Sequence, residues 1–108
     1  MYQDGEDHAE AVKWYRKSAE QGYPDAQNSL GMMYELGIGV SRNYAEAAKW
    51  YRKAAKQGLA AAQFNLGHMY DYGKGVDRNP FIAREWYDKA SKNGFNVEVA
   101  KIFDFRPR

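Results

Sequence analysis

A Trp-Tyr pair recurs every 36 residues in this chain, at Trp14-Tyr15, Trp50-Tyr51 and Trp86-Tyr87. The period extends beyond these pairs, because residues 13–40 and 49–76 are identical at 17 of 28 positions. A fixed period of this length is typical of folds in which each repeat is one small unit that buries its apolar face against the next. We therefore expect the 108 residues to form a single domain, built as a stack of about three units.

Each repeat carries the signals of two helices. Segments of one kind, here called A helices, are predicted at 24–36, 60–72 and 96–104. Segments of the other kind, here called B helices, are predicted to start at the N-caps Asp7, Asn43 and Asn79 and to end just before Gly22, Gly58 and Gly94. Asp and Asn side chains accept hydrogen bonds from free helical N–H groups, and glycine suits the left-handed turn after a helix. The predicted fold class is all-α, with about six helices in antiparallel pairs.

The aromatic residues of the repeat are predicted to fill its core. Apolar side chains recur at helical spacing on both kinds of helix, and a Trp or Tyr side chain buries roughly 150–250 Å². We interpret these rings as packing residues, not as a cofactor site or a stacking platform for bases. The predicted core residues are Trp14, Tyr15, Leu30, Tyr34, Trp50, Tyr51, Leu66, Tyr70, Trp86 and Tyr87.

The repeat also has a specific motif. The pattern A-x-x-x-L-G-x-x-Y-x-x-G-x-G-V, followed by a helix with K-W-Y-R-K-A-A-x-Q-G, runs through 26–58 and again, with substitutions, through 62–94. In this the chain resembles the Sel-one-like repeat (SLR) family, a relative of the tetratricopeptide repeat. The resemblance implies a right-handed solenoid of antiparallel helix pairs that acts as a non-catalytic adaptor or scaffold for other proteins. The units it implies are a partial unit at 1–22, repeats at 23–58 and 59–94, and a C-terminal capping helix at 95–108.

Both ends of the chain depart from this pattern. The first unit has no A helix, so we expect one face of the helix at 7–21 to be partly uncovered. Either the chain is a fragment of a longer solenoid, or a second copy covers that face. At the other end, Phe103 stands where the repeats have Gly31 and Gly67, and Arg106 stands where they have tyrosine. Because the small residue is needed where A and B helices touch, we expect the chain to end in a cap.

The A helices are expected to line the concave side of the stack, and their non-core positions are where the two full repeats differ. Scaffold positions repeat because the geometry repeats, whereas a ligand surface is free to vary. The predicted partner-binding residues are Asn28, Met32, Glu35, Leu36, Phe64, Asn65, His68, Asp71, Tyr72 and Lys101. They are typical of a peptide-binding groove with an acidic rim. Two other interpretations stay open: Met32 and Phe64 pack adjacent units, or the chain is a structural, self-associating end of a solenoid whose partner site lies elsewhere.

Other classes of function have little support in the sequence. The chain has no Cys, and no serine is followed by lysine at the third position, which removes the motif of serine β-lactam enzymes. His68 and Asp71 are three residues apart, but no third metal ligand accompanies them. We therefore predict no catalysis, no metal and no cofactor. The net charge of only +2, with acidic residues on the concave side, argues against nucleic-acid binding.

A membrane location is also not expected. The apolar stretches are far too short to span a bilayer, and the polar, acidic N-terminal segment does not resemble a signal peptide. The absence of Cys suits a reducing compartment such as the cytoplasm, although exported proteins also lack Cys. The compartment is therefore not predicted.

Overall fold

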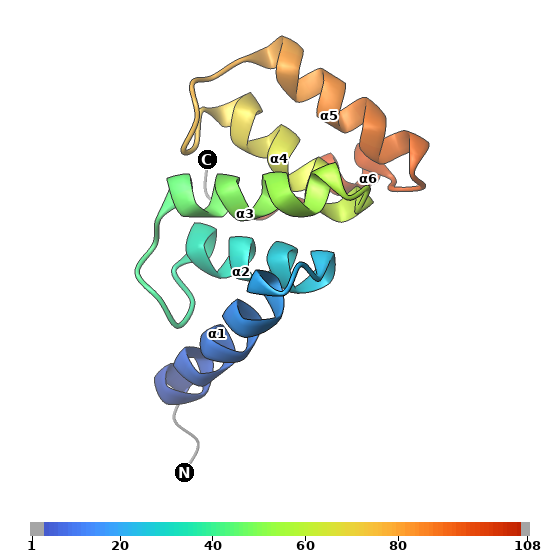
Figure 1. The fold of residues 1–108 in the computed structure, drawn as a ribbon. Coiled ribbons are helices and arrows are strands. Elements are labelled where there is room, and N and C mark those ends of the chain that lie inside the picture. The colour runs from blue at the N-terminus through green and yellow to red at the C-terminus, as the bar shows by residue number, and fades with distance from the viewer. Residues whose placement is uncertain (1–3, 107–108) are drawn as a thin grey trace.

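The structure is a computed structural model that describes residues 4–106, and these residues form six helices and no strand. In chain order the helices are α1 (Asp4–Glu20), α2 (Pro24–Leu36), α3 (Tyr44–Lys56), α4 (Ala60–Tyr72), α5 (Pro80–Lys92) and α6 (Val97–Ile102). The stack rises from α1 to α5 in Figure 1, and neighbouring helices run in opposite directions. The all-α solenoid predicted from the period is confirmed. None of the described helices has the length and apolar character needed to cross a membrane.

Local signals set the ends of these helices. Asn43 caps α3 by accepting a hydrogen bond from the backbone N–H of Glu46, and Asn79 caps α5 in the same way. The prediction that Asp7 caps the first helix is wrong, because α1 begins at Asp4.

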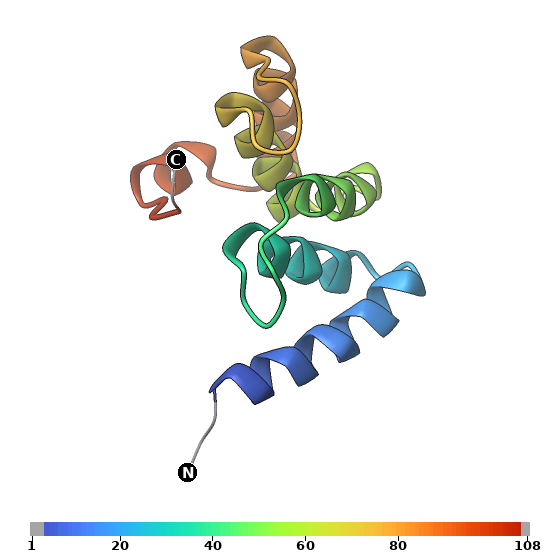
Figure 2. The same cartoon turned by 90° about the vertical axis from the view of Figure 1, so that its left-hand side faces the viewer.

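The predicted last A helix, 96–104, is shorter in the structure. It is α6, which is capped by the Asn96 side chain and ends at Ile102. After it, residues 103–106 leave the helical path and turn towards the A-helix side of the stack, as the red segment in Figure 2 shows. The helix stops early because Asp104 and Arg106 make side-chain contacts there, which are described below.

Side-chain hydrogen bonds follow the same period as the sequence. Gln27 Nε2 donates to the backbone oxygen of Ala19, and Gln63 Nε2 donates to that of Ala55, both at 3.1 Å. Each bond ties the start of an A helix to the end of the B helix before it. The polar framework of the stack is therefore as repetitive as its apolar core.

The expectation that Trp14 and Tyr15 belong to the core is wrong. Their side chains are 64% and 38% exposed, whereas the repeat-equivalent Trp50 is only 5% exposed. Trp50 is covered because Val12 and Leu30 of the two preceding helices belong to the same apolar cluster. No described helix precedes α1 in that way, so the corresponding face of α1 stays open. Pairing of this face with a second copy of the chain stays a prediction.

Each A helix touches the following B helix at a glycine. A Cβ atom added to Gly31 would lie 2.7 Å from the ring of Tyr51 and 3.2 Å from the backbone oxygen of Ala47. Gly67 meets Tyr87 at 2.8 Å in the same way. The small residue thus lets a tyrosine ring lie flat against the A helix, which explains its recurrence after 36 residues.

We predict that Gly31→Ala destabilises the protein by about 1–3 kcal/mol, the usual cost of overpacking a core. The direction of this change in stability is informative, because the same substitution at an exposed helix position stabilises by about 0.5–1 kcal/mol. Urea unfolding followed by circular dichroism measures the difference, with Ser29→Ala on the same helix as the control. A Gly31→Ala variant more stable than the wild type would contradict the close packing described here.

Candidate functional site

A carboxylate at the end of α2 and another at the end of α4 each accept a hydrogen bond from a tyrosine of the next B helix. Tyr51 Oη donates to Glu35 Oε1 at 2.7 Å, and Tyr87 Oη donates to Asp71 Oδ2 at 3.1 Å. Burial raises the pKa of both tyrosines well above the ordinary 10, and the neighbouring carboxylate raises it further. Both hydroxyls are therefore permanent donors, and the acid–tyrosine pair is a repeated structural feature.

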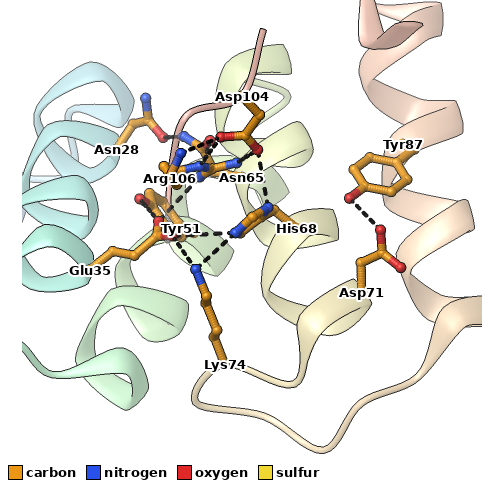
Figure 3. A network of polar contacts seen from close by, with 10 residues as sticks. All are labelled: Asn28, Glu35, Tyr51, Asn65, His68, Asp71, Lys74, Tyr87, Asp104 and Arg106. Atoms are coloured by element: carbon orange, nitrogen blue, oxygen red, sulfur yellow. Dashed lines mark hydrogen bonds and ion pairs between the residues drawn. The ribbon is translucent and has the colours of Figure 1, made fainter. Parts of the chain in front are cut away.

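Glu35 differs from Asp71 in its burial. The Glu35 side chain is only 2% exposed, whereas Asp71 is half-buried. A buried charge is strongly destabilising unless it is paired and hydrogen-bonded. Glu35 has two cationic partners, Lys74 Nζ at 3.5 Å from Oε2 and Arg106 Nη1 at 3.1 Å from Oε1. Glu35 is thus the centre of a buried ionic cluster, shown in Figure 3.

Lys74 reaches this cluster from the Gly-x-Gly turn after α4. The turn packs tightly, because a Cβ atom on Gly75 would lie 2.2 Å from the backbone oxygen of Tyr44 at the start of α3. Gly75 also has a φ of +71°, in the left-handed region. Close backbone packing holds the turn against the stack and buries the Lys74 side chain. The first repeat has Ile38 at this position, so the cation is specific to the second repeat.

Arg106 reaches the cluster from the C-terminal segment. Its Nη1 atom donates both to Glu35 Oε1 at 3.1 Å and to Asn65 Oδ1 at 3.0 Å. Asn28 orients the Asn65 amide, since Asn65 Nδ2 donates to Asn28 Oδ1 at 2.9 Å. The guanidinium carbon also lies 5.6 Å from the centre of the Phe64 ring, within the range of a cation–π contact. Side chains of α2 and α4 therefore enclose this guanidinium.

Asp104 links the same segment to His68. His68 Nδ1 lies 3.2 Å from Asp104 Oδ2, and His68 Nε2 lies 3.1 Å from Lys74 Nζ. Asp104 also accepts two parallel hydrogen bonds from Nε and Nη2 of Arg106, each of 2.9 Å. Lys74 and Arg106 thus place two positive charges beside the carboxylates of Glu35 and Asp104, and His68 Nε2 also lies 3.5 Å from Glu35 Oε2.

The C-terminal segment therefore covers part of the surface that the sequence predicts as free for a partner. Four of the residues predicted at non-core, partner-binding positions are buried, namely Glu35, Phe64, Asn65 and His68. Asp104 and Arg106 supply the opposite charges and hydrogen bonds that let Glu35, Asn65 and His68 leave water. Phe64 is buried because it packs against Tyr87 and Phe95, so it serves to pack adjacent units. Any partner that uses these four residues has to compete with the segment.

The other predicted residues stay accessible. Met32, Leu36 and Tyr72 are each more than a third exposed, although they are large apolar side chains. Asn28 and Asp71 are half-buried and bonded to Asn65 and Tyr87. Lys101 is exposed, and its Nζ atom lies 4.5 Å from the centre of the Tyr87 ring. A hollow beside the C-terminal segment is lined by Phe64, His68, Asp71, Tyr72, Tyr87, Lys101 and Asp104.

Sequence reasoning missed the role of Arg106 and of Lys74. The usable signal was at Arg106, which stands at the repeat position of the half-buried Tyr34 and Tyr70. An arginine at such a position needs an acidic partner, and Glu35 is an acid on the face that the chain turns towards. Within residues 4–106, no group of three or more potential ligand side chains is placed to hold a metal ion.

Comparisons with known proteins agree with this architecture. The Sel1 repeat family matches residues 1–23, 24–59 and 60–95, so the segment that carries Asp104 and Arg106 lies outside the matched repeats. No curated protein sequence matches the chain.

Three solved structures are similar. The first is a protective antigen of uropathogenic Escherichia coli strains with an SLR fold, at 45% identity and a TM-score of 0.82 over 87% of this chain. The second is a Sel1 repeat protein from Oxalobacter formigenes, at 43% identity and a TM-score of 0.76 over 77% of this chain. Cysteine-rich protein B of Helicobacter pylori is 27% identical, with a TM-score of 0.76 over 85%. The matches cover 20%, 63% and 68% of those three chains respectively.

The Asp104 carboxyl gives a test of this geometry that depends on pH. Its burial alone raises the pKa, but the hydrogen bonds and charge of Arg106 outweigh burial and hold the pKa at about 2, below the ordinary 3.8. Because the folded-state pKa is lowered, the stabilisation from Asp104 is complete above about pH 4 and is lost as the pH falls towards 2. Carbon NMR of the side-chain carboxyl should therefore show a midpoint near 2 in the wild type and a higher one in Arg106→Ala. A wild-type midpoint near 3.8 would show that Arg106 does not hold this carboxylate.

Proposed function

We propose that this chain, which belongs to the Sel1 repeat family, is a non-catalytic protein-interaction module. Proteins of this family generally are scaffolds for protein interactions. The more specific part of the proposal is that the face formed by the A helices α2 and α4, here called the concave face, binds an extended peptide segment of a partner protein.

The observation that supports this site most strongly is the course of the chain's own C-terminal segment. Residues 103–106 are not helical, and they lie on the concave face with two side chains bound in it. Arg106 contacts residues of α2 and α4, and Asp104 contacts His68 of α4. The face thus holds a short non-helical polypeptide segment through specific side-chain contacts, which is what peptide recognition requires.

Exposed apolar side chains on the same face extend the surface available to a partner. Met32 and Leu36 lie one helical turn apart on α2, and Tyr72 is at the end of α4. Aromatic residues and methionine are enriched in the cores of protein interfaces. The ring of Tyr72 lies 4.7 Å from that of His68, so this apolar area borders the polar cluster. Together they offer a partner both apolar contact and charge recognition.

We predict that peptides selected from a random phage-displayed library on the immobilised wild-type chain bind the concave face. Their affinity should fall at least about tenfold in Met32→Glu/Tyr72→Ala, because losing central interface contacts costs more than about 1–2 kcal/mol. Fluorescence anisotropy of labelled peptides measures this. The matched control is Lys56→Glu, an exposed residue of the B helix α3, which should leave affinity unchanged. Circular dichroism checks that all variants stay helical.

The opposite pattern decides against the proposal. If the selected peptides bind the folded concave-face variant as tightly as the wild type, the partner site lies elsewhere on the stack. The exposed face of α1 around Trp14 is then the surface to test next.

A further inference from the structure

We propose that the pocket around Glu35 is a guanidinium-binding subsite of the concave face, and that Arg106 fills it in cis. In this proposal, partner peptides that present an Asp-x-Arg sequence displace the C-terminal segment and take its place. The inference rests on the proposed function. It adds that the partner presents an Asp-x-Arg sequence and that the chain's own C-terminal segment competes with it. It is supported by the contacts of Arg106 and Asp104 and by the exposure of Ile102, Phe103 and Phe105 beside them.

The pocket fits a guanidinium group in several independent ways. Glu35 supplies a buried carboxylate, and Asn65 supplies an amide oxygen that Asn28 holds in place. The Phe64 ring covers a third side. The planar guanidinium fork has donors pointing in different directions and stacks on aromatic rings, whereas a lysine ammonium is a compact point charge. The pocket should therefore prefer arginine to lysine.

The acidic residue two positions earlier is part of the same recognition element. Asp104 accepts hydrogen bonds from Nε and Nη2 of Arg106, while Nη1 faces Glu35 and Asn65. Asp104 Oδ2 is also bound to Nδ1 of His68. The carboxylate thus orients the guanidinium and docks on α4 at the same time, which defines an Asp-x-Arg ligand and not an isolated arginine.

The segment that now fills the pocket is held mainly by these two polar side chains. Its apolar side chains contribute little, because Ile102 and Phe103 are largely exposed and Phe105 is 90% exposed. The helix before it, α6, has six residues and buries Val97. A ligand tethered in this way is easier to displace than an element that is packed into the core. Phe103 and Phe105 are already exposed, so they are able to contact other molecules whether or not the segment is displaced.

The second repeat provides an internal control for the subsite. Asp71 occupies the repeat position of Glu35 and accepts the same tyrosine hydrogen bond, from Tyr87. It is half-buried, and no contact joins it to Arg106 among the interactions of the described residues. A change at Asp71 removes an acid–tyrosine pair but leaves the guanidinium pocket intact.

The test uses the full chain with Arg106→Ala, which empties the pocket without truncation. The probe is a fluorescently labelled, end-blocked peptide that copies residues 101–106, Lys-Ile-Phe-Asp-Phe-Arg. We expect it to bind Arg106→Ala at least about tenfold more tightly than the wild type, because a tethered segment competes at an effective concentration on the order of millimolar. Arg106→Lys, which keeps the charge, is the second variant if Arg106→Ala proves unstable.

Two matched changes test the chemistry of recognition. In the Arg106→Ala background, adding Glu35→Gln should weaken peptide binding about tenfold or more, since hydrogen bonds to charged groups are among the stronger ones. Adding Asp71→Asn should weaken binding much less than Glu35→Gln does, because Asp71 lines the neighbouring hollow and makes no hydrogen bond or ion pair with Arg106 among the interactions of the described residues. Replacing the arginine of the peptide by lysine should weaken binding, and replacing it by alanine should abolish it. Circular dichroism and thermal unfolding confirm that each protein variant is folded.

The outcomes separate this inference from the proposed function. If Arg106→Ala binds the arginine and alanine peptides equally, or if Asp71→Asn matters as much as Glu35→Gln, the guanidinium subsite is wrong although peptide binding stands. If the probe does not bind Arg106→Ala while library peptides still depend on Met32 and Tyr72, the inference fails and the proposed function stands. If library peptides are also indifferent to Met32 and Tyr72, both fail.

Discussion

The concave face is organised by the need to neutralise one buried carboxylate. Glu35 lies at the end of α2, where the next B helix covers it, and its charge has to be matched inside the protein. Tyr51 of α3, Lys74 of the following turn and Arg106 of the C-terminal segment meet at it from three separate parts of the chain. This convergence joins the two full repeats to the C-terminal segment.

The repeat supplies a symmetric frame, and the function that we propose depends on where the symmetry is broken. Both A helices end in an acid bound to a tyrosine, and both touch the next helix through a glycine. Glu35 is fully buried and has Lys74 and Arg106 as charge partners, whereas Asp71 at the same repeat position is only half-buried. Scaffold residues thus recur, while residues that recognise a ligand do not.

The sequence predicted the frame well because its signals are local. The ranges 24–36 and 60–72 coincide with α2 and α4, since glycine turns and caps act within a few residues. Burial of the concave face was not predictable in the same way, because Arg106 and Glu35 are 71 residues apart and no periodic signal joins them. Trp14 was misjudged for a related reason: the repeat pattern shows which side chain faces a neighbour, but not whether a neighbour is there.

A double-mutant cycle on Glu35 and Arg106 tests the central ion pair most directly. The wild type, Glu35→Gln, Arg106→Gln and the double variant would be unfolded in urea at pH 7. Because these groups form a buried, charge-assisted contact, we expect a coupling free energy of about 1.5–3 kcal/mol. If the two changes are additive to within about 0.5 kcal/mol, the C-terminal segment is not held on the concave face through Glu35.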